Sequence, residues 1–199
     1  MKKPFQVGIT GGIGSGKSLI CRIFHSLGVP IYDADSHAKN LMTTDGILVD
    51  QIKKEFGTLS YDEKGGLNRK YLSEAVFNDE EKLRKLNSLV HPRVAVDYDR
   101  WLGGNIGKAY VIKEAALLFE SGSSESLDKI ILVTAPEEMR VKRVLKRDPQ
   151  RTNADVHKII GNQMTEEEKL KRADIVIRNN ETELVVPQVL KLHDQWAGE

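Results

Sequence analysis

The chain has 199 residues, of which 40% are hydrophobic and 30% are charged, and its formal net charge at pH 7 is +1. This length suits one α/β domain with inserted lobes, and the composition is that of an ordinary globular protein. Because 30 basic residues balance 29 acidic ones, neither nucleic acid nor a membrane surface is an expected partner, and an anionic ligand must be held by a local site.

The first elements in chain order are a strand, a glycine-rich loop and a helix. Residues 5–10 alternate apolar and polar side chains, which predicts a strand. Apolar residues from Lys17 to Leu27 fall on one helical face, and Gly28 is well suited to end that helix. Residues 29–32 then predict a second short strand, which ends at Asp33.

The later part of the chain alternates short apolar runs with helix-like segments. The runs at 110–112, 130–134 and 175–177 are rich in Ile and Val. This order predicts an α/β fold in which a parallel sheet of about five strands is flanked by helices. The last segment, from about residue 182 to residue 196, predicts a helix that packs on the sheet.

Two intervals depart from the strand–helix alternation. Residues 36–102 contain no convincing strand and predict a helical insertion that forms a substrate lobe. Residues 137–171 are highly charged and helix-prone, with an interruption at Asp148-Pro149, and predict a mobile lid. The expected single domain therefore has a core (1–35, 103–136 and 172–199), a helical lobe (36–102) and a lid (137–171).

Residues 11–18, GGIGSGKS, match the phosphate-binding loop pattern G-x-x-x-x-G-K-[ST]. Glycines permit positive φ and a close approach of the backbone, so that successive N–H groups converge on a phosphate. Lys17 would reach the β- and γ-phosphates, and the Ser18 hydroxyl would bind Mg²⁺. A chance glycine-rich turn is disfavoured because the motif lies between a strand and an amphipathic helix. The expected nucleotide contacts are Gly12, Ile13, Gly14, Ser15, Gly16, Lys17 and Ser18.

A dinucleotide-binding loop is disfavoured by the glycine spacing. The G-x-G-x-x-G pattern begins at Gly12 and Gly14 but meets Lys17 where its third glycine is required. The sequence therefore predicts a P-loop NTPase fold that binds a nucleoside triphosphate.

Asp33 and Asp35 follow the second predicted strand. The carboxyl ends of strands in an open α/β sheet face the ligand crevice. Asp33 there would orient a substrate hydroxyl or accept its proton, and would help to hold Mg²⁺. The alternative is a turn in which Asp35 or Ser36 caps the next helix. We assign the functional role to Asp33 and the cap to Asp35.

A series of segments gives this chain a specific resemblance. GITGGIGSGKS followed by DAD is similar to the opening of dephospho-CoA kinases. GGLNRKYLSEAVFND, in which Arg69, Leu72 and Phe77 fit the family's pattern, continues the match. LNSLVHPRV, EAALLFE, RVKRVLKRD, NQMTEEEK and ADIVIRNN follow in order, so the resemblance spans most of the chain.

The resemblance implies transfer of a phosphoryl group from ATP, with Mg²⁺, to the ribose 3′-hydroxyl of dephospho-CoA, which gives CoA and ADP. It also implies that residues 36–102 bind CoA and that Asp33 is the family's proposed base. The chain departs from the family at Ala116, where proline is usual, and at Lys39 and Lys158, where arginine is usual. Lysine keeps the charge but loses the guanidinium fork.

Three arginines in the predicted lid are candidates for stabilising charge during phosphoryl transfer. Arg143 and Arg147 are four residues apart on one helical face, and the resemblance favours them over a solvated basic face. Arg143 would act in catalysis and Arg147 in ATP binding. Arg140 is the weaker candidate, because the family often has glutamine there.

The remaining candidates have more than one interpretation. Glu114 would assist Mg²⁺ or serve the structure, and Asn179 would border the adenine or form a turn. His91-Pro92 would by itself end a helix, whereas the resemblance makes His91 a CoA contact. Arg69 would pair with a substrate phosphate or with an acidic neighbour. The resemblance adds Leu118 of EAALLFE to the expected substrate contacts.

Cys21 is the single cysteine, so no intrachain disulfide is possible. Lys2 and Lys3 precede no apolar run of a signal peptide, and no stretch approaches the ~18 apolar residues of a membrane span. The histidines lack metal-ligand spacing, which argues against a zinc site. We therefore expect a cytoplasmic monomer or small homo-oligomer. Another nucleoside or nucleotide kinase is the nearest alternative. A P-loop regulatory or GTP-binding module is disfavoured because Asn-Lys-x-Asp does not occur.

Overall fold

The structure, a computed structural model, describes residues 3–76 and 79–198. Phe77, which the resemblance singled out, lies outside the described residues. The chain forms two units, Met1–Asp33 with Asn105–Glu199 and Ala34–Gly104. We call them the sheet unit and the helical unit. No helix in the described residues combines the length and the hydrophobicity needed to cross a lipid bilayer.

The sheet unit is built on parallel strands, as predicted. Within residues 3–76 and 79–198 the sheet has five strands in the order β2-β3-β1-β4-β5. Their bounds are β1 Phe5–Thr10, β2 Ile31–Asp33, β3 Tyr110–Glu114, β4 Lys129–Thr134 and β5 Ile175–Arg178. β2 is shorter than predicted because the Val29 amide donates to the carbonyl of Phe24, so Val29 completes the end of the preceding helix.

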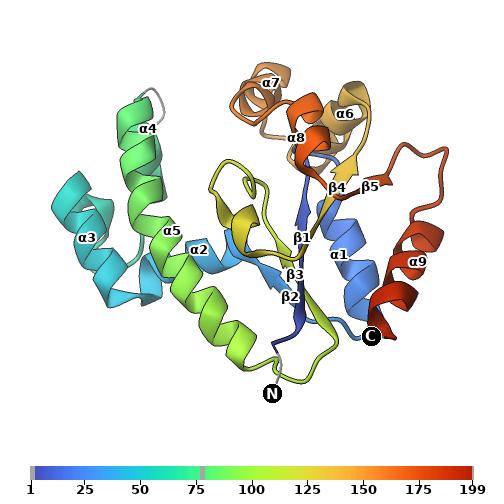
Figure 1. Ribbon diagram of the computed structural model, residues 1–199. Helices are drawn as coiled ribbons and strands as arrows, with labels where there is room; N and C mark the ends of the chain where they lie inside the picture. The colour runs from blue at the N-terminus through green and yellow to red at the C-terminus, as the bar shows by residue number, and fades with distance from the viewer. Residues whose placement is uncertain (1–2, 77–78, 199) are drawn as a thin grey trace. The chain divides into compact units, whose positions relative to one another are not determined.

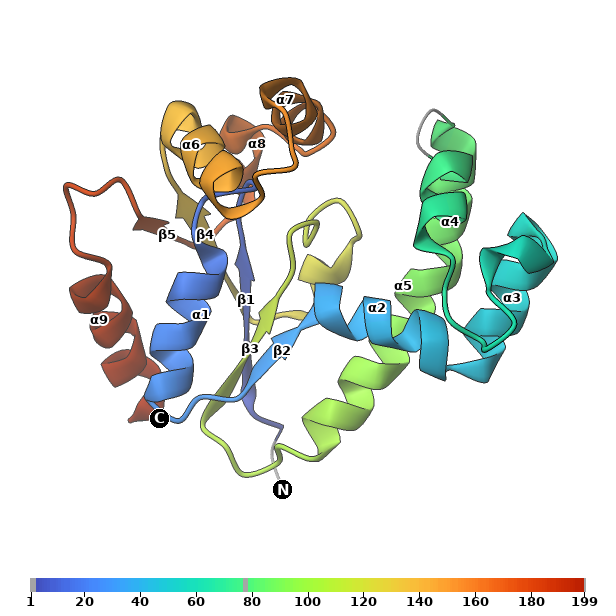
Figure 2. The same ribbon diagram turned by 180° about the vertical axis from the view of Figure 1, so that it is seen from behind.

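Helices α1 (Lys17–Ser26) and α9 (Val185–Ala197) cover one face of this sheet (Figures 1 and 2). Alternate residues of each strand point to that face. Val7 and Ile9 of β1 therefore join a buried cluster with Phe24 of α1 and Trp196 of α9. This core fixes the strand that precedes the P-loop and the helix that follows it, so the loop is held at both ends.

Three further helices lie beyond the carboxyl ends of the strands in both views. They are α6 (Glu137–Arg147), α7 (Asn153–Gly161) and α8 (Glu166–Arg172). Thr152 and Thr165 begin α7 and α8 with capping boxes, in which each threonine exchanges hydrogen bonds with the acidic residue three positions later. α6 ends at Arg147, immediately before the Asp148-Pro149 interruption. These helices belong to the sheet unit.

The helical unit contains α2 (Ala34–Thr44), α3 (Gly46–Phe56), η1 (Thr58–Ser60), α4 (Arg69–Val76) and α5 (Glu80–Gly103). Tyr61 and Leu67 form an isolated β-bridge. α3 begins at Asp45, whose carboxylate accepts the amide of Leu48 at 3.0 Å. The same carboxylate binds the Arg93 guanidinium of α5, with an Nη2–Oδ2 distance of 2.6 Å. Asp45 therefore joins two helices of this unit.

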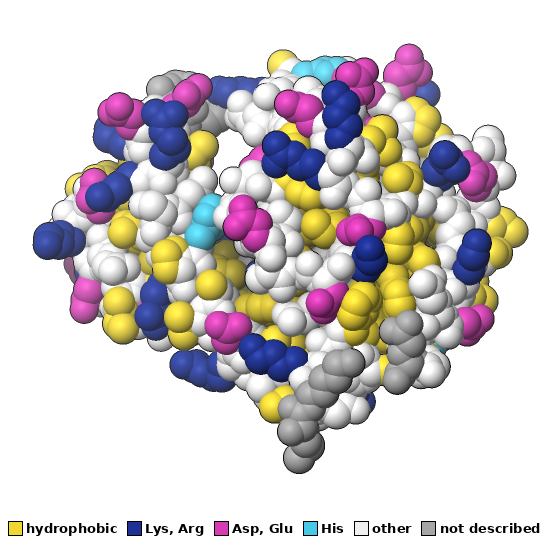
Figure 3. All heavy atoms as spheres, in the orientation of Figure 1, with side chains coloured by type: hydrophobic (Ala, Val, Ile, Leu, Met, Phe, Trp, Pro, Cys, Tyr) yellow, Lys and Arg dark blue, Asp and Glu magenta, His cyan; other side chains and the backbone are white. Residues whose placement is uncertain are grey.

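The structure rules out the helix end that His91-Pro92 would indicate by itself, and the expected Asp35 cap was wrong. α5 runs through His91-Pro92 instead of ending there, because Val90, Val94 and Tyr98 bury one helical face on both sides of the proline. α2 begins at Ala34, so Asp35 lies in its first turn and does not cap it. Basic and acidic side chains are interspersed over the face seen in Figure 3, as expected from a net charge of +1.

Candidate active site

The P-loop connects β1 to α1 with a backbone that depends on glycine. Gly14 and Gly16 have φ values of +78° and +97°, in the left-handed region that other residues rarely adopt. Gly16 occupies the N-cap position of α1, so Lys17 and Ser18 open the helix. The first amides of a helix have no partner within the helix and are available to an anion.

Two side chains from distant parts of the chain pack against the P-loop and support it. Asn179, which follows β5, is buried and donates from Nδ2 to the carbonyl of Ser15 at 2.8 Å. Arg140 of α6 is also buried, and its guanidinium lies where a Cβ atom at Gly12 would be. The Arg140 backbone takes the corresponding place at Gly14. Glycine is therefore required here for packing as well as for backbone conformation.

The polar groups of the P-loop suit a triphosphate. Lys17 donates from Nζ to the carbonyl of Gly11 at 2.9 Å, which keeps the ammonium beside the loop. Ser18 is exposed at the start of α1. The Ser15 side chain is fully buried, and its hydroxyl has no hydrogen-bond partner among the described residues. Such an orphaned group is expected where a ligand or water completes the site.

Asp33 and Glu114 end two neighbouring strands. They are register partners in the β2–β3 pair, and Glu114 is also the partner of Ile9 in β1, next to the P-loop. Burial raises the pKa of the Cys21 thiol, the charges of Glu114 and Asp33 raise it further, and Lys17 lowers it. Three charged residues that are candidates for catalysis and metal binding, Lys17, Asp33 and Glu114, thus act on the Cys21 thiol of α1, and the thiol stays protonated.

The acidic residues of this site cannot complete a metal site by themselves. The part of the chain that the structure describes contains no group of three His, Cys, Asp or Glu residues that could hold a metal ion. Ser18, Asp33 and Glu114 offer the oxygen ligands that Mg²⁺ accepts, and Mg²⁺ is commonly bound through one or two carboxylates plus nucleotide phosphates. The residues present therefore fit a metal that arrives with the nucleotide.

The α6 arginines differ in their surroundings. Arg143 donates from Nη2 to the carbonyl of Asn179 and to Glu181, both at 3.1 Å, and its buried Nη1 has no partner among the described residues. Arg147 is largely exposed and pairs with the adjacent Asp148 at 2.9 Å. Of the two arginines that we favoured, Arg143 is thus the one beside the P-loop support.

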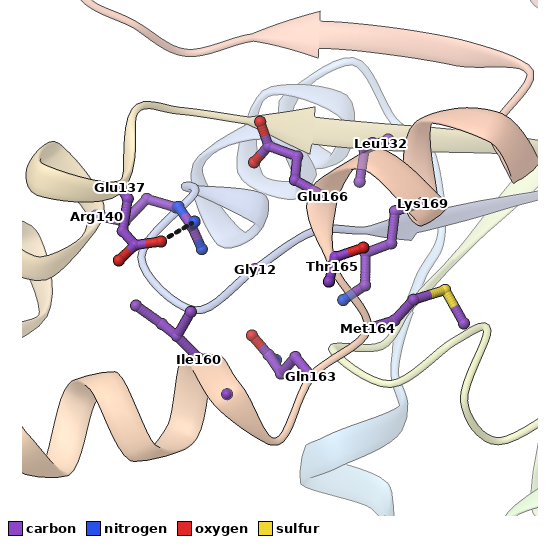
Figure 4. A pocket seen from close by; sticks show the side chains of 11 residues that line it. Gly12, Leu132, Glu137, Arg140, Ile160, Gln163, Met164, Thr165, Glu166 and Lys169 are labelled. Atoms are coloured by element: carbon purple, nitrogen blue, oxygen red, sulfur yellow. Dashed lines mark ion pairs between the residues drawn. The ribbon is translucent and has the colours of Figure 1, made fainter.

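A cavity of about 260 Å³ lies beside the P-loop and within the sheet unit. Figure 4 shows the guanidinium of Arg140 and the ammonium of Lys169 reaching toward it from α6 and α8. Arg140 pairs with Glu137 at 3.6 Å, and its Nε donates to the carbonyl of Ala135. The side chain of Gln163 lies between the cavity and the P-loop, where its Oε1 accepts the amide of Ile13 at 3.0 Å.

The expected substrate contacts lie in both units. Arg69 begins α4 and is exposed, whereas His91 is half-buried within α5 of the helical unit. Leu118 belongs to the sheet unit and is fully buried, with a methyl carbon that would lie 2.7 Å from a Cβ atom at Gly8. Its surface is taken up by packing, so a direct contact between Leu118 and the substrate remains a prediction.

Arg140 and Gln163 are the neighbours of the P-loop that sequence reasoning underrated. The sequence favours Arg143 and Arg147 over Arg140 for contacts with the phosphates. Arg143 and Arg147 follow Arg140 by three and seven residues, however, which puts all three on one side of the helix. Gln163 received no individual role. The sequence feature that points to Gln163 is its place two residues before Thr165. The Thr165 capping box fixes the start of α8, and with it the short polar turn that contains Gln163.

Comparisons with known proteins agree with this geometry. The family model described as dephospho-CoA kinase matches residues 5–184. A dephospho-CoA kinase of Chlorobium chlorochromatii is 39% identical over 98% of this chain and 94% of its own length. A crystal structure of a Thermus thermophilus protein is 34% identical with a TM-score of 0.86 and 98% coverage of each chain. A dephospho-CoA kinase structure from Campylobacter jejuni is 26% identical with a TM-score of 0.72 and 97% coverage of each chain.

Proposed function

The chain belongs to the dephospho-CoA kinase family, and we propose that the groups at the carboxyl ends of β1, β2 and β3 carry out its reaction. The enzyme phosphorylates the ribose 3′-hydroxyl of dephospho-CoA and thereby completes CoA biosynthesis. One observation supports the residue assignment above all: the P-loop, Glu114 and Asp33 end three adjacent strands in that order.

ATP is the proposed phosphoryl donor, held by the amides of residues 12–18. Lys17 would leave the carbonyl of Gly11 for the β- and γ-phosphates, because an ammonium gains more from phosphate oxygens than from one carbonyl. Mg²⁺, bound by Ser18 and by Glu114 directly or through water, would neutralise charge on the phosphates. Asn179 and Arg140 would keep the loop in shape without binding the acceptor.

Asp33 is the proposed partner of the acceptor hydroxyl. The ribose oxygen forms a bond to the γ-phosphorus while the bond from that phosphorus to the β–γ bridging oxygen breaks. The hydroxyl proton passes to the Asp33 carboxylate, and ADP leaves with the bridging oxygen. Because phosphoryl transfer has a loose transition state, Asp33 contributes mainly by holding the hydroxyl in line.

The rest of the substrate would be held by the helical unit through Arg69 and His91, with Leu118 contributing from the sheet unit. A guanidinium such as that of Arg69 suits a phosphate of the CoA moiety. Residues 137–171 would act as a lid, with Arg143 stabilising the transferred phosphoryl and Arg147 the nucleotide. We further propose a cytoplasmic monomer or small homo-oligomer that uses no nucleic acid or membrane partner.

The test is ADP release by the purified protein with ATP and Mg²⁺, in the presence of dephospho-CoA, adenosine, AMP or no acceptor. A rate that depends on dephospho-CoA, with one phosphoryl group gained in the mass spectrum of the product, is expected. Turnover with adenosine or AMP but none with dephospho-CoA would contradict the substrate and leave a P-loop kinase of another specificity.

A further inference from the structure

A series of contacts, in which Lys169 is the buried member, connects α8 to the P-loop. Lys169 of α8 is 2% exposed at its side chain, and its Nζ lies 3.1 Å from Oε1 of Glu120. The same Glu120 oxygen accepts the amide of Met164 at 2.9 Å. Next to Met164, Gln163 accepts the P-loop amide of Ile13. One carboxylate thus hydrogen-bonds the residue beside Gln163 and forms an ion pair with Lys169 of α8, whose Nζ makes no hydrogen bond among the described residues.

The cost of burying the Lys169 ammonium beside a carboxylate that is 21% exposed indicates a role beyond stability. Removing an ammonium from water is expensive, and an ion pair in a dry setting often gains no more than an apolar pair of the same size. Thr165 and Glu168 already cap α8. A turn that only connected two helices would therefore not need the additional contacts with Glu120 and Lys169.

The side chain of Ile13 is held in place as well as its backbone amide. Its side chain packs against a buried cluster of Val141, Val144 and Val156 from α6 and α7. The Ile13 side chain is therefore held by packing against α6 and α7, while its amide is held by the turn before α8. A P-loop with both constraints has its third residue, Ile13, fixed before any nucleotide arrives.

We propose that Gln163 is a positioning residue, held in place by Glu120 and Lys169, which fixes the first turn of the P-loop through the amide of Ile13. The inference rests on the proposed function in one respect, that the P-loop holds the phosphates of ATP. Small displacements of groups that bind a reacting phosphate are costly in rate. The contact also makes the end of the 137–171 segment a fixed point, so that any lid motion takes place before Gln163.

Backbone amide exchange, measured by NMR on the ligand-free full chain, tests the contact without any need for activity. Gln163→Met keeps the size of the side chain but removes the acceptor, and the Ile13 amide should exchange about tenfold faster or more. Gln163→Glu keeps an acceptor oxygen and should leave that amide slow. An unchanged Ile13 amide in a folded Gln163→Met protein would overturn the proposal.

Glu120→Ala and Lys169→Met test the support of Gln163. Both should accelerate exchange at Ile13, and Glu120→Ala should also accelerate it at Met164. Asp174→Ala is a matched control, because Asp174 likewise pairs with a lysine, Lys129 at 2.8 Å, and accepts a backbone amide, that of Ile130 at 2.9 Å. That pair lies at the opposite end of β4. Faster exchange at the Met164 amide with no change at the Ile13 amide would overturn the proposal that Glu120 and Lys169 hold Gln163 in place.

Steady-state kinetics separate positioning from general loosening of the fold. Gln163→Met should raise KM for ATP several-fold and leave KM for dephospho-CoA unchanged. Gln163→Glu, in which the Ile13 amide stays protected, should also raise KM for ATP, because it brings a negative charge toward the phosphates. Tighter ATP binding by Gln163→Met would mean that Gln163 competes with phosphate, and would overturn the positioning role. An inactive wild type with the expected exchange pattern would count against the proposed function alone.

Discussion

Asn179 donates its side-chain amide to the carbonyl of Ser15 at 2.8 Å, although 164 residues separate the two in sequence. The bond is buried, and the Asn179 amide occupies the place that a Cβ atom at Gly16 would need. The residue after β5 thus fixes the middle of the P-loop. We had assigned Asn179 to the adenine or to a turn, and the structure adds a third role.

Asn179→Ala should weaken ATP binding more than it weakens the fold. Loss of one buried hydrogen bond leaves the Ser15 carbonyl without this donor and costs about 1–2 kcal/mol, or up to roughly thirtyfold in KM for ATP. Isothermal titration with ATP, alongside urea unfolding, measures both. Asn180→Ala is the control, since the Asn180 side chain makes its hydrogen bonds to Thr182 and Glu183 of its own turn. Equal effects of the two variants would contradict the assignment.

Gly12→Ala and Gly14→Ala should differ in severity. An alanine at Gly12 meets the movable end of the Arg140 side chain, whereas at Gly14 it meets the Arg140 backbone at a φ of +78°. We expect a loss of about 1 kcal/mol in unfolding free energy for Gly12→Ala and at least about 2 kcal/mol more for Gly14→Ala. Arg140→Ala should reduce the loss of unfolding free energy caused by Gly12→Ala but not the loss caused by Gly14→Ala. A double-mutant cycle that shows no coupling between residues 12 and 140 would disprove this contact.

Lys17→Ala should abolish most turnover while the protein remains folded. The side chain donates to the carbonyl of Gly11 and is only partly buried, so little stability depends on it. Loss of a cation at the transferred phosphate is expected to lower kcat by about 10²-fold or more. ADP release with dephospho-CoA gives the rate, and circular dichroism reports the fold. Arg22→Ala, an exposed cation on the same helix, is the control and should retain activity.

Asp33→Asn should separate turnover from nucleotide binding. The variant keeps the size and polarity of the side chain but accepts the acceptor proton poorly, so kcat should fall by about 10²-fold with little change in Kd for ATP. Rapid-mix kinetics and ATP titration give the two numbers. A selective loss of ATP affinity at unchanged kcat would place Asp33 with the nucleotide and not with the ribose hydroxyl.

The helical unit should lose stability in acid through Asp45. Burial by itself would raise the pKa of this carboxyl, but hydrogen bonds from Arg93 and from the Leu48 amide outweigh it, so the pKa lies below its usual value. A lowered folded-state pKa gives stability that is present above the unfolded value of about 3.9 and is lost as pH falls below it. Asp45→Asn should cost about 2 kcal/mol at pH 7 and progressively less below pH ~4 in urea unfolding.

Asp79→Asn is the matched control for this effect. Asp79 also caps a helix, α5, and pairs with a lysine, but both partners are more exposed than Asp45 and Arg93. Exposed pairs contribute little. A pH dependence at Asp79 as large as that at Asp45 would show that the cap, and not the half-buried Arg93, sets the acid response.

Much of the fold followed from local patterns. Alternating apolar residues before Gly11 and an amphipathic stretch after Lys17 predicted β1, α1 and the loop between them, and short Ile- and Val-rich runs predicted the other strands. These predictions were confirmed because strand and helix periodicities are written in neighbouring residues. The family resemblance was confirmed too, since its motifs recur in order along most of the chain.

Local rules failed where burial outweighed them. His91-Pro92 alone indicates a helix end, yet the apolar face of α5 continues past it and buries Val90 and Val94. Asp35 resembles a cap, but α2 begins at Ala34. At Pro92 the propensity of a single residue was outweighed by the packing of the helix around it.

The sequence by itself determined the P-loop, the parallel sheet and the family, because each is specified by residues close together or by motifs in a fixed order. Only the tertiary structure decided which distant side chains support the loop. Asn179 reaches Ser15, Arg140 lies against Gly12, and Gln163 binds the amide of Ile13. Contacts between residues more than a hundred positions apart depend on how strands and helices pack, and no local period records that packing.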